Sequence, residues 1–462
     1  MKPKIALVGL TAPLYKARLP KFVNGLKPFY LELKKVCENL ASIIHFPVIY
    51  NKQMMEETFK KINDCGCDGV IVVFLSYSPS LIISPVLKKY YKNIPVLIWN
   101  TQKLREINKD FSDSHMLYNH GMHGVQDLTS VLSREKINFS IITGHYKDAQ
   151  VIEKIEKWCK ASFVVRYLKQ STIARIGGEF KEMGDFSVPA AKIKKILGPE
   201  IMNISLKRLS EISLKTTKSE IDGLIKTDRE QFIARVDEKI HYIVARIEIA
   251  LRKIIKENRL NGIAINFESF KGQKGCEVIP FSAISKLLSE GLGYGGEGDV
   301  ICAIAVLIIR QLCGEANFVE MFTTDYKNSR ICFSHMGETN INMAKDKRKI
   351  ELVEKDMAIV KNGLKTIVLR FQIKPGRVTL FNIAPTQESF KFIVSTGDII
   401  DIPISNNITS PYFLLKTDER VEDLLTKYSK LGGTHHLAMA YGNKTEEIQY
   451  LSEIMGLEYF EI

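Results

Sequence analysis

The run Gly69-Val-Ile-Val-Val-Phe-Leu75 indicates how the first third of the chain folds. It contains no polar side chain, and such runs are typical of strands buried on both faces of a parallel sheet. Similar runs lie on either side of it, with amphipathic helical patterns between them. The predicted strands are Ile5–Leu10, Ile43–Tyr50, Gly69–Leu75, Val96–Asn100 and Phe139–Gly144, and the predicted helices span about 28–41, 53–64, 80–91, 122–134 and 147–160. This alternation predicts a doubly wound α/β domain.

Ligands of such sheets bind beyond the carboxyl ends of the strands. The segments expected at those ends are Leu10–Tyr15, Ser76–Pro79 and Asn100–Gln102.

A second α/β region is predicted after the first. It opens with the strand Ile173–Gly177 and contains long helices around 217–257, the strand Gly262–Asn266 and the loop Phe267–Gly275. Beyond about Glu315, short apolar runs separated by turns at Lys374-Pro-Gly376 and Thr396-Gly397 predict antiparallel β structure, a small barrel or sandwich. Those runs are Thr366–Ile373, Arg377–Ile383, Phe390–Ser395 and Asp398–Pro403, followed by a helix, the strand His436–Ala440, another helix and Leu457–Ile462.

We therefore predict three domains in a mixed α/β chain. They are a flavodoxin-like α/β domain at 1–170, a central α/β domain at 171–315 and a C-terminal β-rich, barrel-like domain at 316–462.

Composition excludes several classes of protein. Of the 462 residues, 45% are hydrophobic and 25% are charged, close to the averages for globular proteins, so a fibrous repeat, a disordered chain and a membrane bundle are not expected. The net charge of +13 is spread over amphipathic helices without a DNA-binding motif, so we expect no nucleic acid partner. The eight cysteines are scattered, Ile5–Leu10 is predicted to be a strand rather than a signal peptide, and Val300–Ile309 is too short to span a bilayer. These features predict a cytoplasmic protein with reduced thiols and no membrane association.

The glycine-rich segment Gly291-Leu-Gly293-Tyr-Gly-Gly296 matches the dinucleotide pattern G-x-G-x-x-G. That pattern requires a strand before the loop and a helix after it. Here Phe281–Glu290 is predicted to be a helix that ends at Gly291, so the match is interpreted as accidental. Glu297-Gly298-Asp299 follows, at the start of the apolar helix Val300–Leu312. Acidic residues favour a helix N-terminus, but a carboxylate flanked by glycines also suits coordination of a closely approaching ligand.

Three further segments place single polar side chains in apolar surroundings. Glu320 lies within Phe318–Phe322, an apolar run ends at His335 in the segment Phe333-Ser-His335-Met-Gly-Glu338, and His435-His436 opens a strand. Taken singly, Glu320 is expected on a solvent face and His335 in the core or a turn, and strand alternation would turn only one of the histidine pair inward. Two glutamates and two histidines together are nevertheless ligands that suit Mn²⁺ and related divalent ions.

Several separated segments, in order, resemble the L-arabinose isomerase family along essentially the whole chain. Leu14-Tyr15 resembles its H-L-Y-G loop, and Gly69–Pro79 resembles G-V-I-x-W-x-H-T-F-S-P. Ile94–Gln102 is similar to P-x-L-H-L-x-T-Q, Asn119–Gly124 to N-x-x-x-H-G, and Ala174–Gly177 to A-R-x-G. Gly293–Asp299, Phe318-x-Glu320, Ser334-His335-Met336 and Gly432-Gly-x-His435-His436 complete the set.

The resemblance implies a metal-dependent aldose–ketose isomerase. Its divalent metal, usually Mn²⁺ with Co²⁺ or Mg²⁺ as substitutes, falls on Glu297, Glu320, His335 and His436, and the same two glutamates serve as acid and base. Residues at the sugar fall on Leu14, Tyr15, Tyr77, Gln102 and His123. His123 matches a histidine that reaches the sugar from a neighbouring subunit, so a homo-oligomer, a trimer or hexamer, is expected.

This chain departs from the family pattern at a number of positions, several of which would line the sugar pocket. Ala12 replaces a glutamine, Leu75 a histidine, Tyr77 a phenylalanine and Val300 a tryptophan, while Pro13 and Lys16 flank Leu14-Tyr15. The resemblance therefore leaves the sugar and its stereochemistry open.

Isomerisation through an enediol explains why such residues are needed. One carboxylate must take a proton from carbon, another must move the hydroxyl proton, and a cation across two sugar oxygens stabilises the developing negative charge. Two other interpretations remain. A non-catalytic carbohydrate-binding or regulatory protein would bind sugar without exchanging the C2 proton, and a nucleotide-binding oxidoreductase would use Gly291–Gly296 without a metal.

Overall fold

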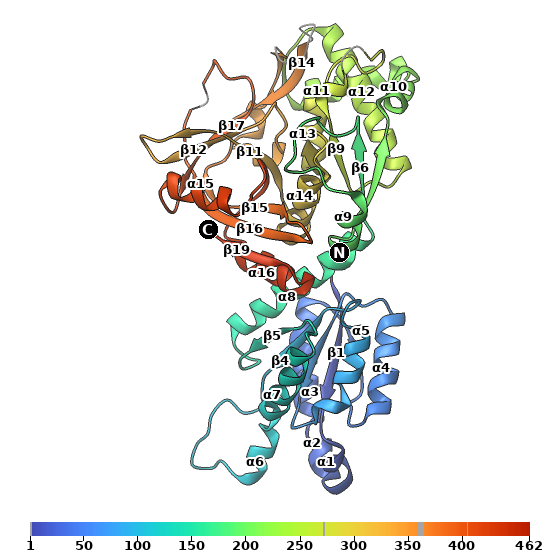
Figure 1. The fold of residues 1–462 in the computed structure, drawn as a ribbon, viewed down its shortest axis with the longest axis vertical. Coiled ribbons are helices and arrows are strands. Elements are labelled where there is room, and N and C mark those ends of the chain that lie inside the picture. Colours follow the sequence, from blue (N-terminus) through green and yellow to red (C-terminus); the bar gives the residue numbers. More distant parts are fainter. Residues whose placement is uncertain (1, 271–272, 358–364, 404) are drawn as a thin grey trace. The chain divides into compact units, whose positions relative to one another are not determined.

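The computed structural model describes residues 2–270, 273–357, 365–403 and 405–462. The chain forms two compact units. The first contains Met1–Tyr167 and Glu446–Leu457, and the second contains Leu168–Thr445 and Glu458–Ile462. The mixed fold with parallel sheets followed by an antiparallel one confirms the predicted fold class (Figure 1).

The first unit is built on a five-stranded parallel sheet of order β2-β1-β3-β4-β5, the flavodoxin-like order. Its strands are β1 (Lys4–Leu10), β2 (Ser42–His45), β3 (Gly69–Phe74), β4 (Val96–Asn100) and β5 (Ser140–Thr143). Its helices are α1 (Pro13–Arg18), α2 (Pro20–Gly25), α3 (Lys27–Leu40), α4 (Lys52–Asp64), α5 (Ser84–Tyr90), α6 (Asp113–Tyr118), α7 (Gly121–Arg134), α8 (Ala149–Lys169) and most of α16 (Thr445–Met455).

Helices cover both faces of this sheet. On one face, apolar side chains of α4, α5 and α7 pack against alternate residues of β1, β3 and β4, among them Val8, Val72 and Ile98. On the other face, Tyr30 of α3 donates a hydrogen bond to the carbonyl of Leu7 at 2.8 Å.

Two predictions for this region were wrong in detail. The strand predicted over Ile43–Tyr50 ends at His45, and only an isolated bridge between Leu10 and Ile49 continues it. Pro47 has no backbone N–H to donate to a sheet, which explains the early end. The helix predicted over 80–91 is divided into the 3₁₀ turn η1 (Ser80–Ile82) and α5.

The second unit begins with a four-stranded parallel sheet of order β10-β9-β6-β7. Its strands are β6 (Thr172–Ile176), β7 (Glu200–Ile204), β9 (Gly262–Ile265) and β10 (Gly293–Gly296). The helices of this region are α9 (Ala190–Ile196), α10 (Leu206–Leu214), α11 (Lys218–Gln231), α12 (Glu238–Glu257), α13 (Phe281–Ser289) and α14 (Val300–Cys313). The predicted loop 267–275 contains the 3₁₀ turn η2 (Phe267–Phe270), and its residues 271–272 lie outside the described residues.

A buried ion network joins three of these helices. The Lys286 amine of α13 contacts Asp228 of α11 at 2.8 Å and also Glu248 of α12. Asp228 additionally bonds His241, and Glu248 accepts from Arg252 at 2.9 Å. Burial opposes a charged lysine, but the two carboxylates outweigh it and the pKa of Lys286 is raised. The network therefore keeps the Lys286 side chain protonated although it is buried.

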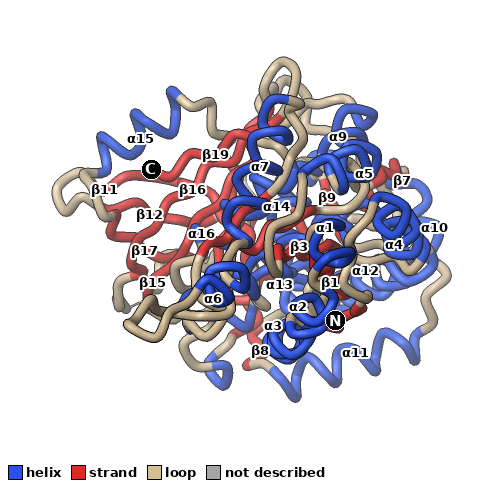
Figure 2. Tube along the Cα trace, turned by 90° about the horizontal axis from the view of Figure 1, so that it is seen from below, coloured by secondary structure: helices blue, strands red, loops and turns tan. Residues whose placement is uncertain are grey.

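The last part of the chain forms a closed barrel. Six strands follow the order β15-β18-β11-β12-β17-β16, and pairing of β15 with β16 closes the ring. They are β11 (Asn317–Asp325), β12 (Arg330–Ser334), β15 (Gly376–Pro385), β16 (Phe390–Ile399), β17 (Tyr412–Thr417) and β18 (His436–Tyr441). β19 (Glu458–Glu461) adds to β16 in parallel. Figure 2 shows these strands gathered together, with α15 (Val421–Lys430) beside them.

Three of the four runs predicted in this region differ from the structure. Phe390–Ser395 and the first two residues of the run Asp398–Pro403 belong to one strand, β16, because Gly397 continues the ladder by pairing with Val378 and Thr417 instead of forming a turn. The run Thr366–Ile373 lies in a separate sheet of β8 (Ile233–Arg235), β13 (Glu351–Asp356) and β14 (Lys365–Arg370). The 3₁₀ turns η3 (Ile341–Met343) and η4 (Lys347–Lys349) precede β13.

None of the helices in the described ranges combines the length and apolar character that a membrane span requires. All eight cysteines are free thiols.

Candidate metal centre

Glu297 is held at the junction between β10 and α14. The chain leaves β10 at Gly296, and both Glu297 and Gly298 adopt left-handed backbone, with φ of 59° and 87°. Asp299 then caps α14 by accepting the backbone N–H groups of Ile301 and Cys302, each at 2.9 Å. A non-glycine residue in this conformation is strained, and such strain is concentrated at functional sites.

We expect Gly298→Ala to destabilise the protein by more than about 1 kcal/mol, because alanine is disfavoured at positive φ. Its Cβ atom would also strike the carbonyl oxygen of Gly178. Thermal unfolding would measure the loss. The control is Gly184→Ala, since no atom lies within 4 Å of the added Cβ atom at that exposed position. Equal melting temperatures for the two variants would contradict the expectation.

Strand pairing brings the other three predicted ligands together. Glu320 of β11 is paired with His436 of β18 on one side and with Ser334 of β12 on the other, and His335 directly follows Ser334. The ring of Phe318 lies 4.9 Å from the rings of both histidines, measured between centroids. The two imidazoles are 5.3 Å apart by the same measure.

Contacts then connect these side chains with Glu297. Nε2 of His436 lies 3.8 Å from Oε2 of Glu297, and Nε2 of His335 lies 3.9 Å from Oε2 of Glu320. The glutamate side chains are 10% and 22% exposed, whereas both imidazoles are buried. The structure thus brings Glu297, Glu320, His335 and His436 to one place.

Each of the two buried imidazoles is oriented by a buried carboxylate. His436 donates through Nδ1 to Asp299 at 3.1 Å, and His335 donates through Nδ1 to Glu338 at 2.8 Å. Glu338 is itself held by the Tyr294 hydroxyl at 2.7 Å. A carboxylate on one ring nitrogen fixes the proton there and leaves Nε2 as a lone-pair donor, the usual arrangement around histidine ligands of metals.

His435 corrects the prediction that only one of the histidine pair would point inward. Its Nε2 lies 3.1 Å from Oε2 of Glu297, its Nδ1 contacts Asp185 at 2.6 Å, and its ring centroid is 4.0 Å from that of His436. Strand alternation does not apply, because β18 begins only at His436. Burial opposes protonation of His435, but hydrogen bonds to Asp185 and Glu297 outweigh it and raise its pKa to about 10.

Burial perturbs most of the remaining titratable groups. It raises the pKa of Asp299 to about 7 and also raises the pKa of Glu320. It lowers the pKa of His436, with the nearby His335 and His435 charges acting in the same direction. For His335, burial would lower the pKa, but the Glu338 carboxylate outweighs it and the pKa is raised.

The donor set fits a divalent cation. Among the described residues, Nε2 of His436 is a buried nitrogen without any hydrogen-bond partner, and desolvating such an atom is costly unless something binds it. Ligand atoms of Glu297, His435 and His436 all lie within 4.8 Å of one another. Carboxylate oxygens and imidazole nitrogens are ligands that Mn²⁺, Co²⁺ and similar ions accept.

The predicted sugar-contacting residues belong to the first unit, and the structure groups some of them. Tyr77 stacks on His123 with ring centroids 4.6 Å apart, and the Tyr15 hydroxyl lies 3.4 Å from Nδ1 of His120. His120 in turn contacts His123 at 3.2 Å. His120 was not predicted, because it precedes the helix expected at 122–134; in the structure it is the N-cap residue of α7, three residues before His123.

Leu14 and Gln102 do not join this group by any contact among the described residues. Leu14 lies in α1 and is 52% exposed, and Gln102 donates instead to the carbonyl of Leu104 at 2.8 Å. Three of the positions that depart from the family pattern, Ala12, Leu75 and Val300, are buried.

The dinucleotide interpretation of Gly291–Gly296 is wrong. Helix α13 precedes these glycines, and Gly293–Gly296 form strand β10, paired in parallel with β9. In this part of the described chain the glycines thus form a strand and not the loop that would face a pyrophosphate.

Comparison with known proteins identifies the family of the chain. Three family models match consecutive stretches: the N-terminal domain of L-arabinose isomerase at residues 24–170, its central domain at 172–314 and its C-terminal domain at 315–458. The fold and the three family matches together identify the protein as a sugar isomerase. More particularly, the chain belongs to the L-arabinose isomerase family.

Curated relatives match over nearly the full chain at low identity. The L-arabinose isomerase of Thermotoga maritima is 27% identical over 95% of this chain and 91% of its own. The L-arabinose isomerase of Shouchella clausii is 24% identical over 95% of this chain and 93% of its own. The enzyme of Bacillus subtilis is 25% identical over 95% of this chain and 92% of its own. A solved solute-binding protein of an ABC transporter from Actinobacillus succinogenes covers 67% of this chain at 13% identity and a TM-score of 0.19, a likeness too low to support any inference.

Proposed function

We propose that this protein is a divalent-metal-dependent aldose–ketose isomerase that interconverts a free pentose or hexose with its ketose through an enediol. The convergence of Glu297 and Glu320 with the Nε2 atoms of His335 and His436 is the observation that carries this proposal. It is supported by the family to which the chain belongs.

Glu297, Glu320, His335 and His436 would hold the cation, and His435 lies close enough to Glu297 to join them. Mn²⁺ is the proposed ion, with Co²⁺ or Mg²⁺ as substitutes. When bound, such an ion supplies electrostatic stabilisation of negative charge on neighbouring sugar oxygens.

The protein's own side chains would then move the protons. One glutamate takes the proton from C2 of the aldose and returns it to C1, and the other transfers the hydroxyl proton. We assign the hydroxyl transfer to Glu320, because burial raises its pKa and it retains a proton to higher pH than an exposed glutamate does. Glu297, held in strained backbone between two glycines, is assigned to the carbon-bound proton.

Leu14, Tyr15, Tyr77, Gln102 and His123 are proposed to contact the sugar. The stacked Tyr77 and His123 rings present an apolar face with polar edges, a surface suited to a sugar ring or chain. By the family resemblance, His123 would serve the site of a neighbouring subunit, so we propose a homo-oligomer, a trimer or hexamer, in the cytoplasm.

Sugar turnover and proton exchange test the proposal together. Purified protein with Mn²⁺ is incubated with pentoses, hexoses and 6-deoxyhexoses in D₂O, and ketose formation and deuterium at C2 are followed by NMR. We expect at least one aldose to give its ketose with exchange, and chelation by EDTA to abolish both until Mn²⁺ is restored. Sugar binding without exchange would overturn the proposal and support the non-catalytic carbohydrate-binding alternative instead.

A further inference from the structure

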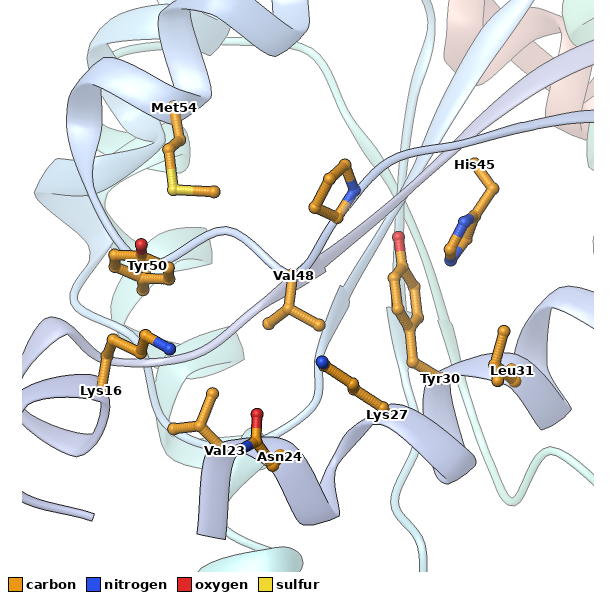
Figure 3. Close-up of a pocket in the computed structure, with 11 residues that line it drawn as sticks. Lys16, Val23, Asn24, Lys27, Tyr30, Leu31, His45, Val48, Tyr50 and Met54 are labelled. Atoms are coloured by element: carbon orange, nitrogen blue, oxygen red, sulfur yellow. The ribbon is translucent and has the colours of Figure 1, made fainter. Parts of the chain in front are cut away.

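The first unit contains a cavity of about 380 Å³ that the proposed reaction does not use (Figure 3). Helices α1, α2 and α3 form one side, and the segment from the end of β2 into α4 forms the other. The volume lies within the range of small-molecule sites.

The walls of this cavity are mainly apolar. Val23, Leu31, Val48 and Met54 line it together with the aromatic ring of Tyr50. In Figure 3, Val48, Met54 and Tyr50 surround the middle of the cavity from the side of β2 and α4. Such a surface favours a flat, apolar body that can lie against the Tyr50 ring.

Two ammonium groups point into the same space. Figure 3 shows the amines of Lys16 and Lys27 directed towards its middle from α1 and α3. The Lys16 amine lies 5.6 Å from the centre of the Tyr50 ring, and no described side chain forms an ion pair or hydrogen bond with either amine. None of the described residues that line the cavity carries a carboxylate.

A third polar nitrogen, on the His45 ring, also lines the cavity. His45 stacks against Tyr30 with ring centroids 4.6 Å apart, and its buried Nε2 has no hydrogen-bond partner among the described residues. Two ammonium groups without an ion-pair partner among the described residues, beside an apolar surface, favour an anionic ligand.

The cavity lies where a ligand other than the sugar could bind to this sheet. It lies at the carboxyl ends of β1 and β2, the edge at which open α/β sheets hold ligands. The cluster of Tyr15, Tyr77 and His123 involves the ends of β1 and β3, and none of these three residues lines the cavity.

We propose that this cavity binds a phosphate monoester with an aromatic body, of the size of a nucleoside monophosphate. The two lysines would hold the phosphate dianion, and the aromatic body would lie on Tyr50 between Val48 and Met54. A dianion with several acceptor oxygens satisfies both ammonium groups at once, which a single carboxylate does less well. The proposal does not depend on the isomerase reaction.

Isothermal titration calorimetry of the full-length protein with AMP tests this proposal. Adenosine and inorganic phosphate, the two parts of AMP, are titrated separately. We expect AMP to bind more tightly than either half, and Lys16→Gln and Lys27→Gln each to weaken it by about 10-fold, the value of a charge-assisted hydrogen bond. Tyr50→Leu should weaken AMP but leave the affinity for phosphate unchanged.

The matched control is Lys21→Gln, which removes the same charge from an exposed position on α2 that does not line the cavity. The AMP affinity of this variant should lie within about twofold of the wild-type value, because salt largely screens a surface charge that does not line the cavity. The proposal is overturned if AMP does not bind, if phosphate alone binds as tightly as AMP, or if the Lys21 variant loses as much affinity as the Lys16 and Lys27 variants. Circular dichroism confirms that each variant is folded.

Discussion

Glu320→Gln is expected to lower the turnover of the preferred sugar by about 100-fold or more, the usual cost of losing an acid–base group. Glutamine keeps the size and the position of the side chain on β11, but its amide neither holds an exchangeable acid proton nor carries the negative charge that a cation requires. Glu297→Gln should have a comparable effect for the second proton transfer. The measurements are ketose formation under saturating sugar and the stoichiometry of bound Mn²⁺.

The control for this pair is Glu388→Gln, at an exposed position in the loop between β15 and β16. It removes the same charge from the same unit and should leave turnover unchanged. Wild-type activity in both the Glu297 and the Glu320 variants would contradict the assignment of the site, even if sugar isomerisation itself were observed.

Lys286→Met is expected to cost about 3–5 kcal/mol of stability, because it removes the buried ammonium that Asp228 and Glu248 share and leaves them only Arg252 and His241 as partners. The Lys286 side chain is 7% exposed, and those of Asp228 and Glu248 are 5% and 1% exposed. Methionine fills similar space but cannot neutralise either carboxylate, so the loss is electrostatic rather than a cavity effect. Urea unfolding followed by far-UV circular dichroism would measure it.

Lys253→Met provides the matched comparison in the same unit. Lys253 pairs with Glu220 at 2.7 Å, but the two side chains are 37% and 39% exposed, so loss of this pair should cost under about 1 kcal/mol. Adding Asp228→Asn and Glu248→Gln to the Lys286→Met variant should recover part of its lost stability. Equal unfolding midpoints for Lys286→Met and Lys253→Met would show that the buried network contributes nothing special.

The parallel sheets could be predicted from sequence because their signal is local. Strands such as Gly69–Phe74 are buried on both faces, and their apolar runs are uninterrupted. The barrel was harder to predict, because pairing between strands far apart in the sequence produces no recognisable pattern in a short stretch of residues. Gly397 was expected in a turn, yet its pairing with Val378 and Thr417 makes it part of a continuous strand.

The candidate site shows the same limit. Glu297, Glu320, His335 and His436 came from a family resemblance, and no spacing along the chain predicts that β11 pairs Glu320 with His436. The supporting carboxylates Asp185 and Glu338 were missed, because single acidic residues outside any motif give no sequence signal. His435 was misjudged because strand alternation was applied to both histidines, although His435 lies just before β18 and is not part of it.

The closed barrel has an evolutionary consequence. Because Glu320 and His436 face each other across one ladder of a ring without a break, a one-residue insertion within β11 or β18 would turn either side chain to the opposite face of the wall. Lineages can therefore not shift these two groups independently by small insertions or deletions. The helices of the first unit, which carry Tyr15 and His123, are free of that constraint, so drift in the accepted sugar is expected to accumulate there by substitution.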